Sequence, residues 1–349
     1  MTALAPPKVP DLAPAPAPEV RRSSYPSAWL AGGSLGAVVL LALMPEIISQ
    51  GGLVVLLNFF ILLTMATMWN LLAGYAGMVS IGQQAFVGLG GYSVVVLAVN
   101  GLNPLASIPL AAVIPALVAL PISYLVFRLR GGYFAIATWV VADTAELVIS
   151  SVTALGGGTG HPVPGLGSLS PRTFGDVTYW LSLGVAVLAL AVTYGLLRSR
   201  LGLVLAAVRD DEVGARSAGA RVMQARRIVF VVAALGCGAA GALLAVSQLQ
   251  VQPGSIFSVQ WAAEMIFVTM IGGMGTIEGP ILGTVLFFVL QQNLASQGAW
   301  YLVILGSVAV VVAIWAPKGI WGFVSSRLRF QLFPVGYLLG GRGSTGRRR

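Results

Sequence analysis

Two carboxylates in one apolar segment are the side chains best placed for chemistry. Asp143 and Glu146 lie three residues apart in a stretch that begins at Tyr133 and reads as a helix, so they share one helical face. A charge inside a membrane is costly and usually points into the helix bundle, where it can relay protons. A paired structural charge, or a pair solvated near the surface, is the alternative. We favour it because the apolar segments hold no basic relay partner, and we interpret Glu264 in the same way.

Other side chains that catalyse reactions or bind metals are too sparse to form a site. Cys237 and His161 are each the only residue of their type, which argues against an internal disulfide, a Cys- or His-based metal site and histidine catalysis. The lysines, Lys8 and Lys318, follow no phosphate-binding glycine loop, and no serine-nucleophile or zinc-protease motif occurs. The sequence therefore predicts a non-catalytic chain that itself binds no metal, no ATP and no other cofactor.

The composition is that of a membrane protein. Hydrophobic residues make up 57% and charged residues 9% of the 349 positions, whereas soluble domains carry about 25% charge. The net charge of +9 comes from basic blocks between apolar segments, a pattern typical of membrane topology and not of a nucleic-acid interface. We therefore predict an all-α polytopic membrane protein with no nucleic-acid partner.

The apolar segments predict about ten transmembrane helices, some of them broken or re-entrant. They cover about 29–48, 51–69, 80–99, 104–127, 133–151, 178–197, 228–249, 261–273, 279–295 and 300–316, with a polar loop at 153–177. Residues 29–320 thus form the membrane domain, between a Pro/Ala-rich tail (1–28), predicted to be disordered, and a basic tail (321–349). In this arrangement 19 of the 20 basic residues lie on one side and only Arg172 lies on the other, so both termini are predicted to be cytoplasmic.

A glycine-rich stretch, residues 70–92, interrupts the apolar pattern. Its polar residues are Asn70, Ser80, Gln83 and Gln84. Irregular backbone at membrane depth is tolerated where protein or a water-filled cavity satisfies its polar groups. We therefore predict that these four side chains line a substrate pathway through a broken helix. A glycine-rich helix that only packs tightly is the alternative.

The same break is repeated in the second half of the chain. Residues 77–81, Gly-Met-Val-Ser-Ile, are echoed by residues 273–277, Gly-Met-Gly-Thr-Ile. Paired glycine-interrupted segments in the two halves of a carrier point to a pathway at a repeat interface. The sequence therefore predicts two weakly related halves, and it adds Gly273 and Thr276 to the candidate pathway.

A charged stretch, residues 199–227, separates the sixth and seventh predicted spans. Asp210, Asp211 and Glu212 are predicted to lie at a helix N-terminus, and Gly219 is predicted to end that helix. A short amphipathic helix presented to the cytoplasm is a docking surface. A solvated charged loop is the alternative, but about thirty residues in a tightly connected membrane domain favour a functional role.

Four motifs in this order resemble the permease subunits of ATP-driven importers for branched-chain amino acids, over about residues 50–320. The motifs are residues 70–77 with 82–83 and 86–92; Arg130 and Gly131 with 133–136, Asp143 and 156–160; 209–212 with Ala215 and Gly219; and 272–276 with Gly279, Pro280 and Gly283. The motif order and the charged middle loop are more similar to the larger, M-type permease of the pair. Arg216 and Glu146 depart from the family pattern, which usually has an acid at the first position and often a basic residue at the second.

The resemblance implies a fold similar to type II ATP-binding-cassette importers, in a multi-pass protein of the bacterial inner membrane. It implies that a second homologous permease completes the pathway, that a substrate-binding protein delivers Leu, Ile and Val, and that two ATPase subunits consume the ATP. The ATPase-docking role falls on Arg209, Asp210, Asp211, Glu212, Ala215 and Gly219.

The residues alone leave other functions open. Ser, Thr, Gln, Asn and Gly along a pathway do not select leucine over urea, amides or other small amphiphiles. A secondary carrier driven by an ion gradient would use Asp143. A membrane-embedded enzyme is the third possibility, and the absence of catalytic motifs argues against it.

Overall fold

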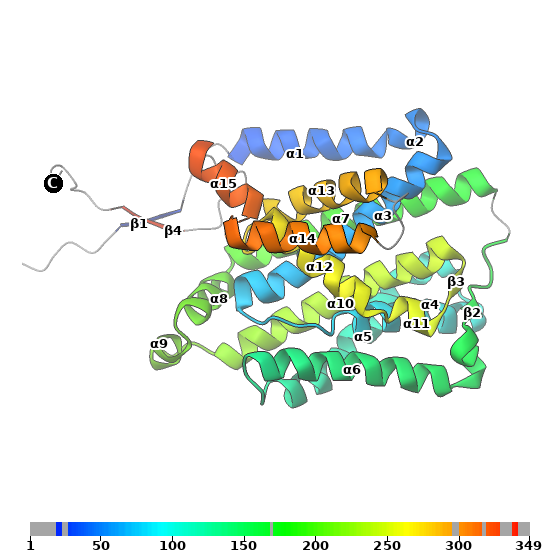
Figure 1. The fold of residues 1–349 in the computed structure, drawn as a ribbon, viewed down its shortest axis with the longest axis horizontal. Coiled ribbons are helices and arrows are strands. Elements are labelled where there is room, and N and C mark those ends of the chain that lie inside the picture. The colour runs from blue at the N-terminus through cyan, green and yellow to red at the C-terminus, as the bar shows by residue number, and fades with distance from the viewer. Residues whose placement is uncertain are drawn as a thin grey trace, which may run out of the picture.

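The computed structural model describes residues 19–22, 27–167, 170–294, 300–315, 319–328 and 337–340. The long helices lie side by side in one bundle (Figure 1). They are α1 (Ser27–Ala42), α3 (Gln50–Asn70), α4 (Gln84–Val99), α5 (Pro104–Val126), α6 (Gly132–Ser151), α7 (Pro171–Arg198), α10 (Val222–Gln248), α12 (Val259–Gly272), α13 (Glu278–Leu294) and α14 (Trp300–Trp315). Shorter elements are α2 (Met44–Ile47), the π-turn η1 (Leu71–Tyr75), η2 (Thr153–Leu155), η3 (Gly157–Thr159), α8 (Arg200–Asp210), α9 (Glu212–Ser217), α11 (Pro253–Ile256) and α15 (Gly319–Leu328).

Helix α10 lies at the centre of the bundle because it is built from small residues. Residues 236–242 read Gly-Cys-Gly-Ala-Ala-Gly-Ala, and the helix packs against α3, α4 and α5. A Cβ atom on Gly241 would overlap the backbone carbonyl of Val87 in α4, so the two backbones touch directly. Of the most apolar part of α10, 78% is buried. The helix therefore serves as the core against which the others are arranged.

Among the described residues, six helical segments are long and apolar enough to cross a membrane. They are Gln50–Tyr75, Pro104–Val126, Gly132–Ser151, Pro171–Arg198, Val222–Gln248 and Pro253–Gly272. Helices also occupy the other four predicted positions, but α1, α4 and α14 have 16 residues and α13 has 17, fewer than the ~20 that span a bilayer without help. The described chain is thus mostly helical, with six candidate membrane spans.

Several predicted boundaries were wrong. The first predicted span is divided between α1 and α2, and Pro45 lies at the start of α2. The predicted loop 153–177 is shorter, because Pro171 begins α7 and the Ser170 hydroxyl caps it by accepting a hydrogen bond from the Thr173 N–H (3.2 Å). The third span begins at Gln84 and not at residue 80, which leaves residues 76–83 outside any membrane-length helix.

Two pairs of short strands lie at opposite ends of the bundle (Figure 1). At one end β2 (His161–Pro162) pairs with β3 (Gln250–Val251); at the other β1 (Glu19–Arg22) pairs with β4 (Tyr337–Gly340). Strand β1 and the start of α1 fall within the tail predicted to be disordered, so these parts of the tail have regular structure. The rest of that prediction, for residues 1–18 and 23–26, lies outside the described residues.

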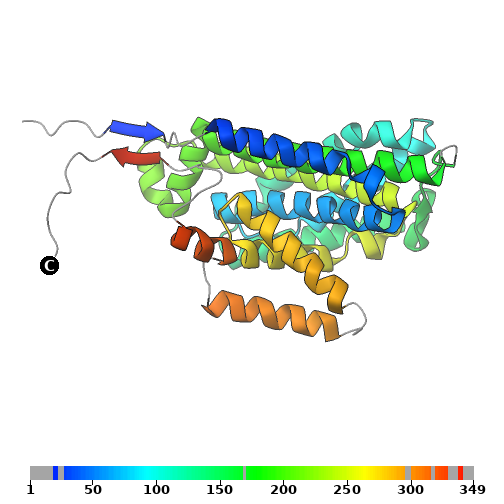
Figure 2. The ribbon, with the colours of Figure 1, turned by 90° about the horizontal axis from the view of Figure 1, so that it is seen from above.

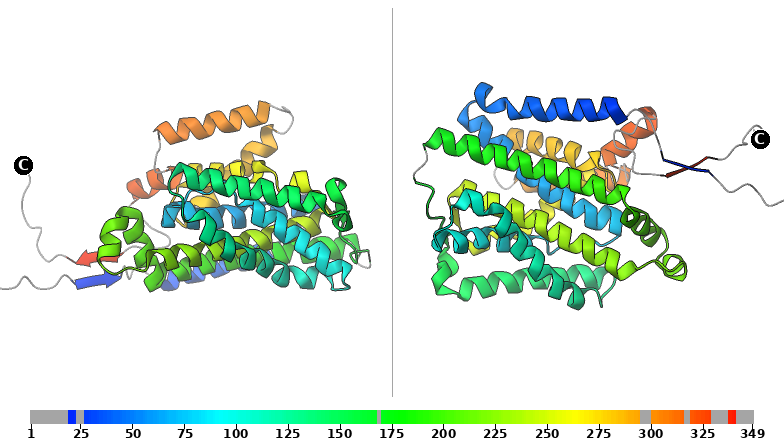
Figure 3. Two further views of the ribbon diagram at one scale, coloured as in Figure 1. Left: turned by 90° about the horizontal axis from the view of Figure 1, so that it is seen from below. Right: turned by 180° about the vertical axis from the view of Figure 1, so that it is seen from behind.

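Three helices are set apart from the central layers. Helix α14 lies at the outer edge of the bundle (Figure 2), and α8 and α9 extend beyond one end of it (Figure 3). The chain therefore presents the folded charged loop at one end, next to the turn between α5 and α6.

Candidate functional site

Asn70 joins the two glycine-rich breaks. Helix α3 ends at this residue and continues as η1, whereas α12 ends at Gly272 and leaves residues 273–277 outside any helix. Asn70 Nδ2 donates a hydrogen bond to the Thr276 carbonyl (2.7 Å), and the Gly275 N–H donates to Asn70 Oδ1 (2.8 Å). Backbone groups that leave a helix inside a bundle need such partners. The buried Asn70 amide, at the end of α3, thus supplies hydrogen-bond partners for two backbone groups of the second break.

The two breaks also touch through their backbones. A Cβ atom added to Gly74 would lie 2.5 Å from the Gly275 nitrogen and 2.9 Å from its Cα, so no larger residue fits without movement. Gly275 has φ +77°, a conformation that side chains disfavour. The sequence echo therefore corresponds to a physical contact, which we call the glycine junction (residues 70–77 and 273–277).

The second break is short and enclosed. The Thr276 hydroxyl donates to the Gly273 carbonyl (2.7 Å) and accepts from the Gly279 N–H (3.0 Å), which closes the turn into α13. A Cβ atom on Gly319 of α15 would lie 2.5 Å from the Gly273 nitrogen. Backbone therefore packs on backbone from two directions, and the turn has little room to change shape.

The first break is longer and is held by side chains from two helices. Residues 77–83 form an irregular segment. Trp69 Nε1 in α3 donates to the Ser80 carbonyl (2.8 Å), and the Ile81 N–H donates to the Thr138 hydroxyl in α6 (3.2 Å). The segment therefore runs back along α3 and beside α6 before α4 begins.

The polar side chains predicted to line a pathway are buried within the chain. Gln83 Nε2 donates to the Ser80 hydroxyl (3.3 Å), and the Cys237 thiol lies 3.7 Å from Gln83 Oε1. Gln84 is also buried, and within the described part of the chain neither atom of its side-chain amide has a hydrogen-bond partner. In this conformation these groups serve the interior of the chain, and their pathway role stays a prediction.

The charged loop folds into α8 and α9. Asp211 Oδ1 caps α9 by accepting from the Val213 N–H (2.9 Å), and Glu212 lies in the first turn. Asp210 is instead the last residue of α8, which corrects its predicted place in the same helix start. Gly219, with φ +82°, follows the end of α9 as predicted.

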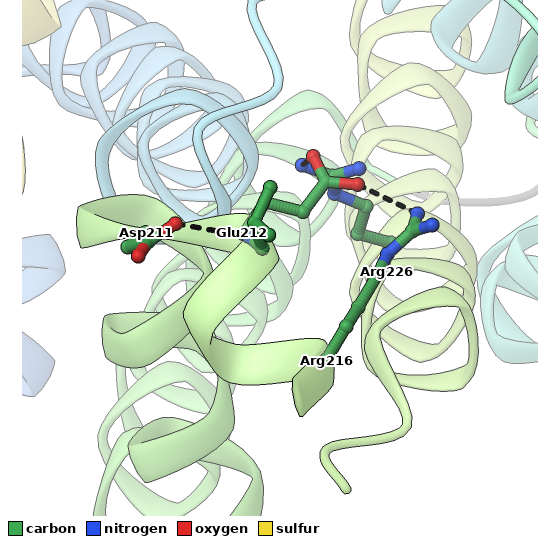
Figure 4. A network of polar contacts seen from close by, with 5 residues as sticks. Asp211, Glu212, Arg216 and Arg226 are labelled. Atoms are coloured by element: carbon green, nitrogen blue, oxygen red, sulfur yellow. Dashed lines mark hydrogen bonds and ion pairs between the residues drawn. The ribbon is translucent and has the colours of Figure 1, made fainter. Parts of the chain in front are cut away.

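Glu212 ties α9 to the first turns of α10. Its two carboxylate oxygens accept from Arg216 Nη2 (2.6 Å) and Arg226 Nη2 (3.0 Å), and Figure 4 shows the carboxylate directed at these guanidinium groups. Burial raises the pKa of Glu212, but Arg226, Arg216 and Arg130 together outweigh burial and hold that pKa below its ordinary value. The carboxylate is therefore negatively charged at neutral pH and paired on both sides.

Arg209 connects α8 to the glycine junction. Its Nη1 donates to the Gly74 carbonyl (3.2 Å) and would lie 3.4 Å from a Cβ atom on Gly275. Its Nε lies 3.4 Å from Asp210 Oδ1. Ala215 of α9 is buried in a small apolar cluster with neighbouring valines. Arg209 thus reaches both breaks from the charged loop.

A cavity of about 330 Å³ lies between the charged loop and the first break. It is lined by Gly77, Met78, Val79, Phe127, Leu129, Arg130, Gly131, Gly132, Phe134, Ala135, Glu212 and Arg226. Its walls come from the first break, the α5–α6 turn and the ion pair of Glu212 with Arg226. The folded loop, the turn and the break therefore surround one space.

The site lies within a recognisable family. A model of the permease component of branched-chain amino acid transport systems matches residues 53–313. The chain belongs to this family. The match includes both breaks and the charged loop, confirms the resemblance seen in the sequence, and shows a non-catalytic permease component of an ATP-binding-cassette transport system. The permease is accordingly a multi-pass membrane protein.

Curated relatives of the permease share about a quarter of its residues. It is 27% identical to the high-affinity branched-chain amino acid transport system permease protein LivM of Salmonella typhimurium, over 85% of this chain and 76% of that protein. It is 26% identical to the protein of the same name from Escherichia coli, over 84% and 75% of the two chains. A probable branched-chain amino acid transport permease protein LivM of Methanocaldococcus jannaschii is 25% identical over 60% and 58%. No solved structure matches the permease.

The acids of the apolar segments are not gathered into one site. Asp143 is exposed on α6 and Glu146 is half-buried, so the expectation that such charges point into the bundle does not hold for Asp143. Glu264 is buried in α12 and accepts a hydrogen bond from Gln260 Nε2 (2.8 Å). No group of three His, Cys, Asp or Glu side chains suited to a metal ion occurs within the described ranges.

Sequence reasoning missed three partners of the site. Arg226 completes the ion pair with Glu212, Trp69 holds the Ser80 carbonyl, and Thr138 holds the Ile81 amide. Thr138 and Trp69 lie in apolar helices, where one threonine or tryptophan is an ordinary packing residue. Only the tertiary fold brings these residues to the break, so the local sequence held no signal for them.

Proposed function

We propose that the permease and a second homologous permease chain form the pathway by which Leu, Ile and Val cross a bacterial inner membrane. A substrate-binding protein delivers these amino acids, and two ATPase subunits dock on residues 199–227. The support for this substrate class is the family and the branched-chain amino acid transport for which the LivM relatives are named. Urea, amides and other small amphiphiles are the alternative substrates to be tested.

The proposed topology has ten spans, two weakly related halves and a type II-like arrangement, with both termini in the cytoplasm. Arg130, Glu212 and Arg226 line one cavity, so the α5–α6 turn and the charged loop share one end of the bundle. Arg172 lies at the opposite end of α7 from Arg198. This distribution of basic residues supports the assignment of the loop-bearing end to the cytoplasm.

The observation that carries the proposed mechanism is the contact of Arg209 with the glycine junction. A force applied to α8 and α9 acts on a guanidinium that is hydrogen-bonded to the Gly74 carbonyl. The junction is the place where α3 and α12 both lose their helical hydrogen bonds. ATP-driven movement of the docking subunits is thereby converted into a change at the two breaks, which opens the pathway alternately to each side.

The candidate pathway residues are those of the two breaks: Asn70, Ser80, Gln83, Gln84, Gly273 and Thr276. Opening at the first break involves the exchange of side-chain hydrogen bonds, such as that from Trp69 Nε1 to the Ser80 carbonyl. Such an exchange exposes amide and hydroxyl groups suited to a zwitterion. Gln84 supports this view, since its buried amide lacks a partner among the described residues.

Vesicles that contain the full complex test the proposal. Labelled leucine uptake is measured with ATP inside the vesicles, binding protein outside and the proton gradient collapsed, and ATP hydrolysis is measured in parallel. We expect uptake to need ATP and to persist without the gradient. Arg209→Gln should lower the leucine transported per ATP hydrolysed, because α8 loses its bond to the junction.

Arg198→Gln is the matched control, because its guanidinium donates to Tyr194 of its own helix and lies outside the docking range. Unchanged coupling in Arg209→Gln would contradict the proposed link. Uptake that collapses with the proton gradient would contradict ATP-driven import. Uptake of urea or amides without leucine uptake would replace the proposed substrate class.

A further inference from the structure

Helix α6 presents an exposed face that is poorly suited to contact with lipid. Of the most apolar part of α6, 17% is buried, against 78% for α10. Its exposed apolar side chains include Tyr133, Ile136, Val140 and Leu147, which follow a spacing of three and four residues, with Val148 exposed beside them. Asp143 continues the same spacing between Val140 and Leu147 and is also exposed. A regular apolar seam of this kind is typical of a helix that packs on another helix.

The acid of this seam lies deep within the proposed span. Asp143 follows Gly132 by eleven residues and precedes Ser151 by eight. At about 1.5 Å per residue it is about 16 Å from one end of the helix and about 12 Å from the other. A carboxylate at such depth is too costly to face hydrocarbon, so it faces water or protein.

A second, independent feature adjoins the seam. Gly77 and Val79 are exposed, while Met78 and Ser80 between and beyond them are buried, so one side of the irregular segment is open. The hydrogen bond between the Ile81 N–H and Thr138 places this segment beside α6. Gly77 and Val79 also line the cavity shared with Glu212 and Arg226, so the open side of this segment continues a polar space along α6.

We propose that this surface, the α6 face (Ile136, Val140, Asp143 and Leu147 with Gly77 and Val79), is covered by the second permease chain. The apolar seam of α6 packs on a helix of that chain. A water-filled pathway remains between the two chains along Val79 and Asp143, where it hydrates the carboxylate and the open backbone. The inference rests on the proposed function and identifies which surface of this chain performs it.

Spin-label accessibility tests the contact. Cys237 is the only cysteine and is fully buried, so Cys237→Ala provides a background for single labels at Val140→Cys and Leu147→Cys. The control is Leu188→Cys on α7, where Leu188 is 59% exposed against 56% for Val140. We expect assembly with the second permease to remove most of the oxygen accessibility at residues 140 and 147 and to leave residue 188 unchanged.

High oxygen accessibility at residues 140 and 147 in the assembled pair would show that the α6 face meets lipid and would overturn the proposal. A loss at residue 188 alone would place the contact elsewhere and would also overturn it. ATP-dependent leucine uptake is measured on the same samples. Normal uptake with a lipid-facing α6 refutes this inference only, whereas absent uptake in the unlabelled complex refutes the proposed function.

A second measurement tests the water-filled pathway and does not depend on α6 variants. Val79 lines the cavity at the charged-loop end, so the membrane-impermeant maleimide is added from the opposite side of the membrane. Val79→Cys in the same background should react with it in the assembled complex, whereas Leu188→Cys should not. Protection of residue 79 from this reagent in every nucleotide state would overturn the water-filled part of the proposal.

Discussion

The two glycine-rich breaks have similar sequences but different structures. Residues 77–83 leave the helical path for seven positions and are held by side chains of α3 and α6. Residues 273–277 turn at once into α13 and pack backbone against backbone. At Gly77 only the backbone angle requires glycine, since the nearest atom to an added Cβ is 3.9 Å away, whereas an added Cβ on Gly82, at the other end of this break, would overlap the Thr138 carbonyl of α6. The start of the first break, at Gly77, is thus adaptable, whereas its end at Gly82 and the second break are rigid.

The largest effect is expected where the two breaks touch. Gly74→Val places methyl groups on the Gly275 backbone, which has no room for them. Overpacking against backbone should cost about 3 kcal/mol or more, a large share of the stability of the protein. Thermal unfolding of the purified permease in detergent measures this loss as a fall in the midpoint temperature.

Gly77→Ala is the control for that experiment. Gly77 has open space around its Cα, so a side chain there is penalised only by the left-handed backbone conformation (φ +66°). The expected loss of unfolding free energy is about 1–2 kcal/mol. If Gly77→Ala destabilises the permease as much as Gly74→Val, the distinction between the adaptable backbone at Gly77 and the rigid contact of Gly74 with Gly275 is wrong.

A smaller effect is expected from the side chain that joins the breaks. Asn70→Ala leaves the Thr276 carbonyl and the Gly275 N–H without their buried partner. The expected loss of unfolding free energy is about 2 kcal/mol, measured by the same thermal scan. Asn58→Ala is the control, because Asn58 Nδ2 bonds only to the Val54 carbonyl of its own helix. Equal losses for the two asparagines would show that Asn70 does not join the breaks.

The sequence predicted where the helices break but not what the breaks do. Glycine content and the repeated pentapeptide located both interruptions, since glycine acts locally. That Gly74 meets Gly275 was not predictable, because the contact joins positions 201 apart in the chain. Asn70 was predicted as a pathway residue from its polarity alone, whereas the structure shows its amide satisfying backbone groups. The helix start of Asp211 and Glu212 was predictable, because a cap depends on neighbouring residues; the partner Arg226 was not.

The ion pair at the cavity should matter less for stability, and it concerns the first break alone. Glu212 and Arg226 line the cavity beside Gly77 and Val79, and no residue of the second break lines it. For such a partly buried pair at the rim of a cavity, a double-mutant cycle with Glu212→Gln and Arg226→Gln should give a coupling energy of about 1 kcal/mol. Hydrogen exchange of the backbone amides in α9 and in residues 77–83 measures this coupling energy. Equal loosening of residues 273–277 would contradict the assignment of this pair to the first break.

The smallest expected effect is on pH dependence, and its sign follows from Glu212. Because the pKa of Glu212 is lowered in the folded chain, the attachment of α9 is fully present above the ordinary pKa, near 4.5 for this carboxyl group. It is lost as the pH falls through the lowered value. A nitroxide at Val213→Cys, in the Cys237→Ala background, should therefore keep a low mobility from pH 7 to about pH 5. Its mobility should rise below the ordinary pKa of Glu212. The same label with Glu212→Gln should be more mobile at every pH and show no such step. This result would distinguish titration of Glu212 from titration of Asp210 and Asp211. A step that persists in Glu212→Gln would assign the titration to the aspartates and leave the first break without this link to the docking loop.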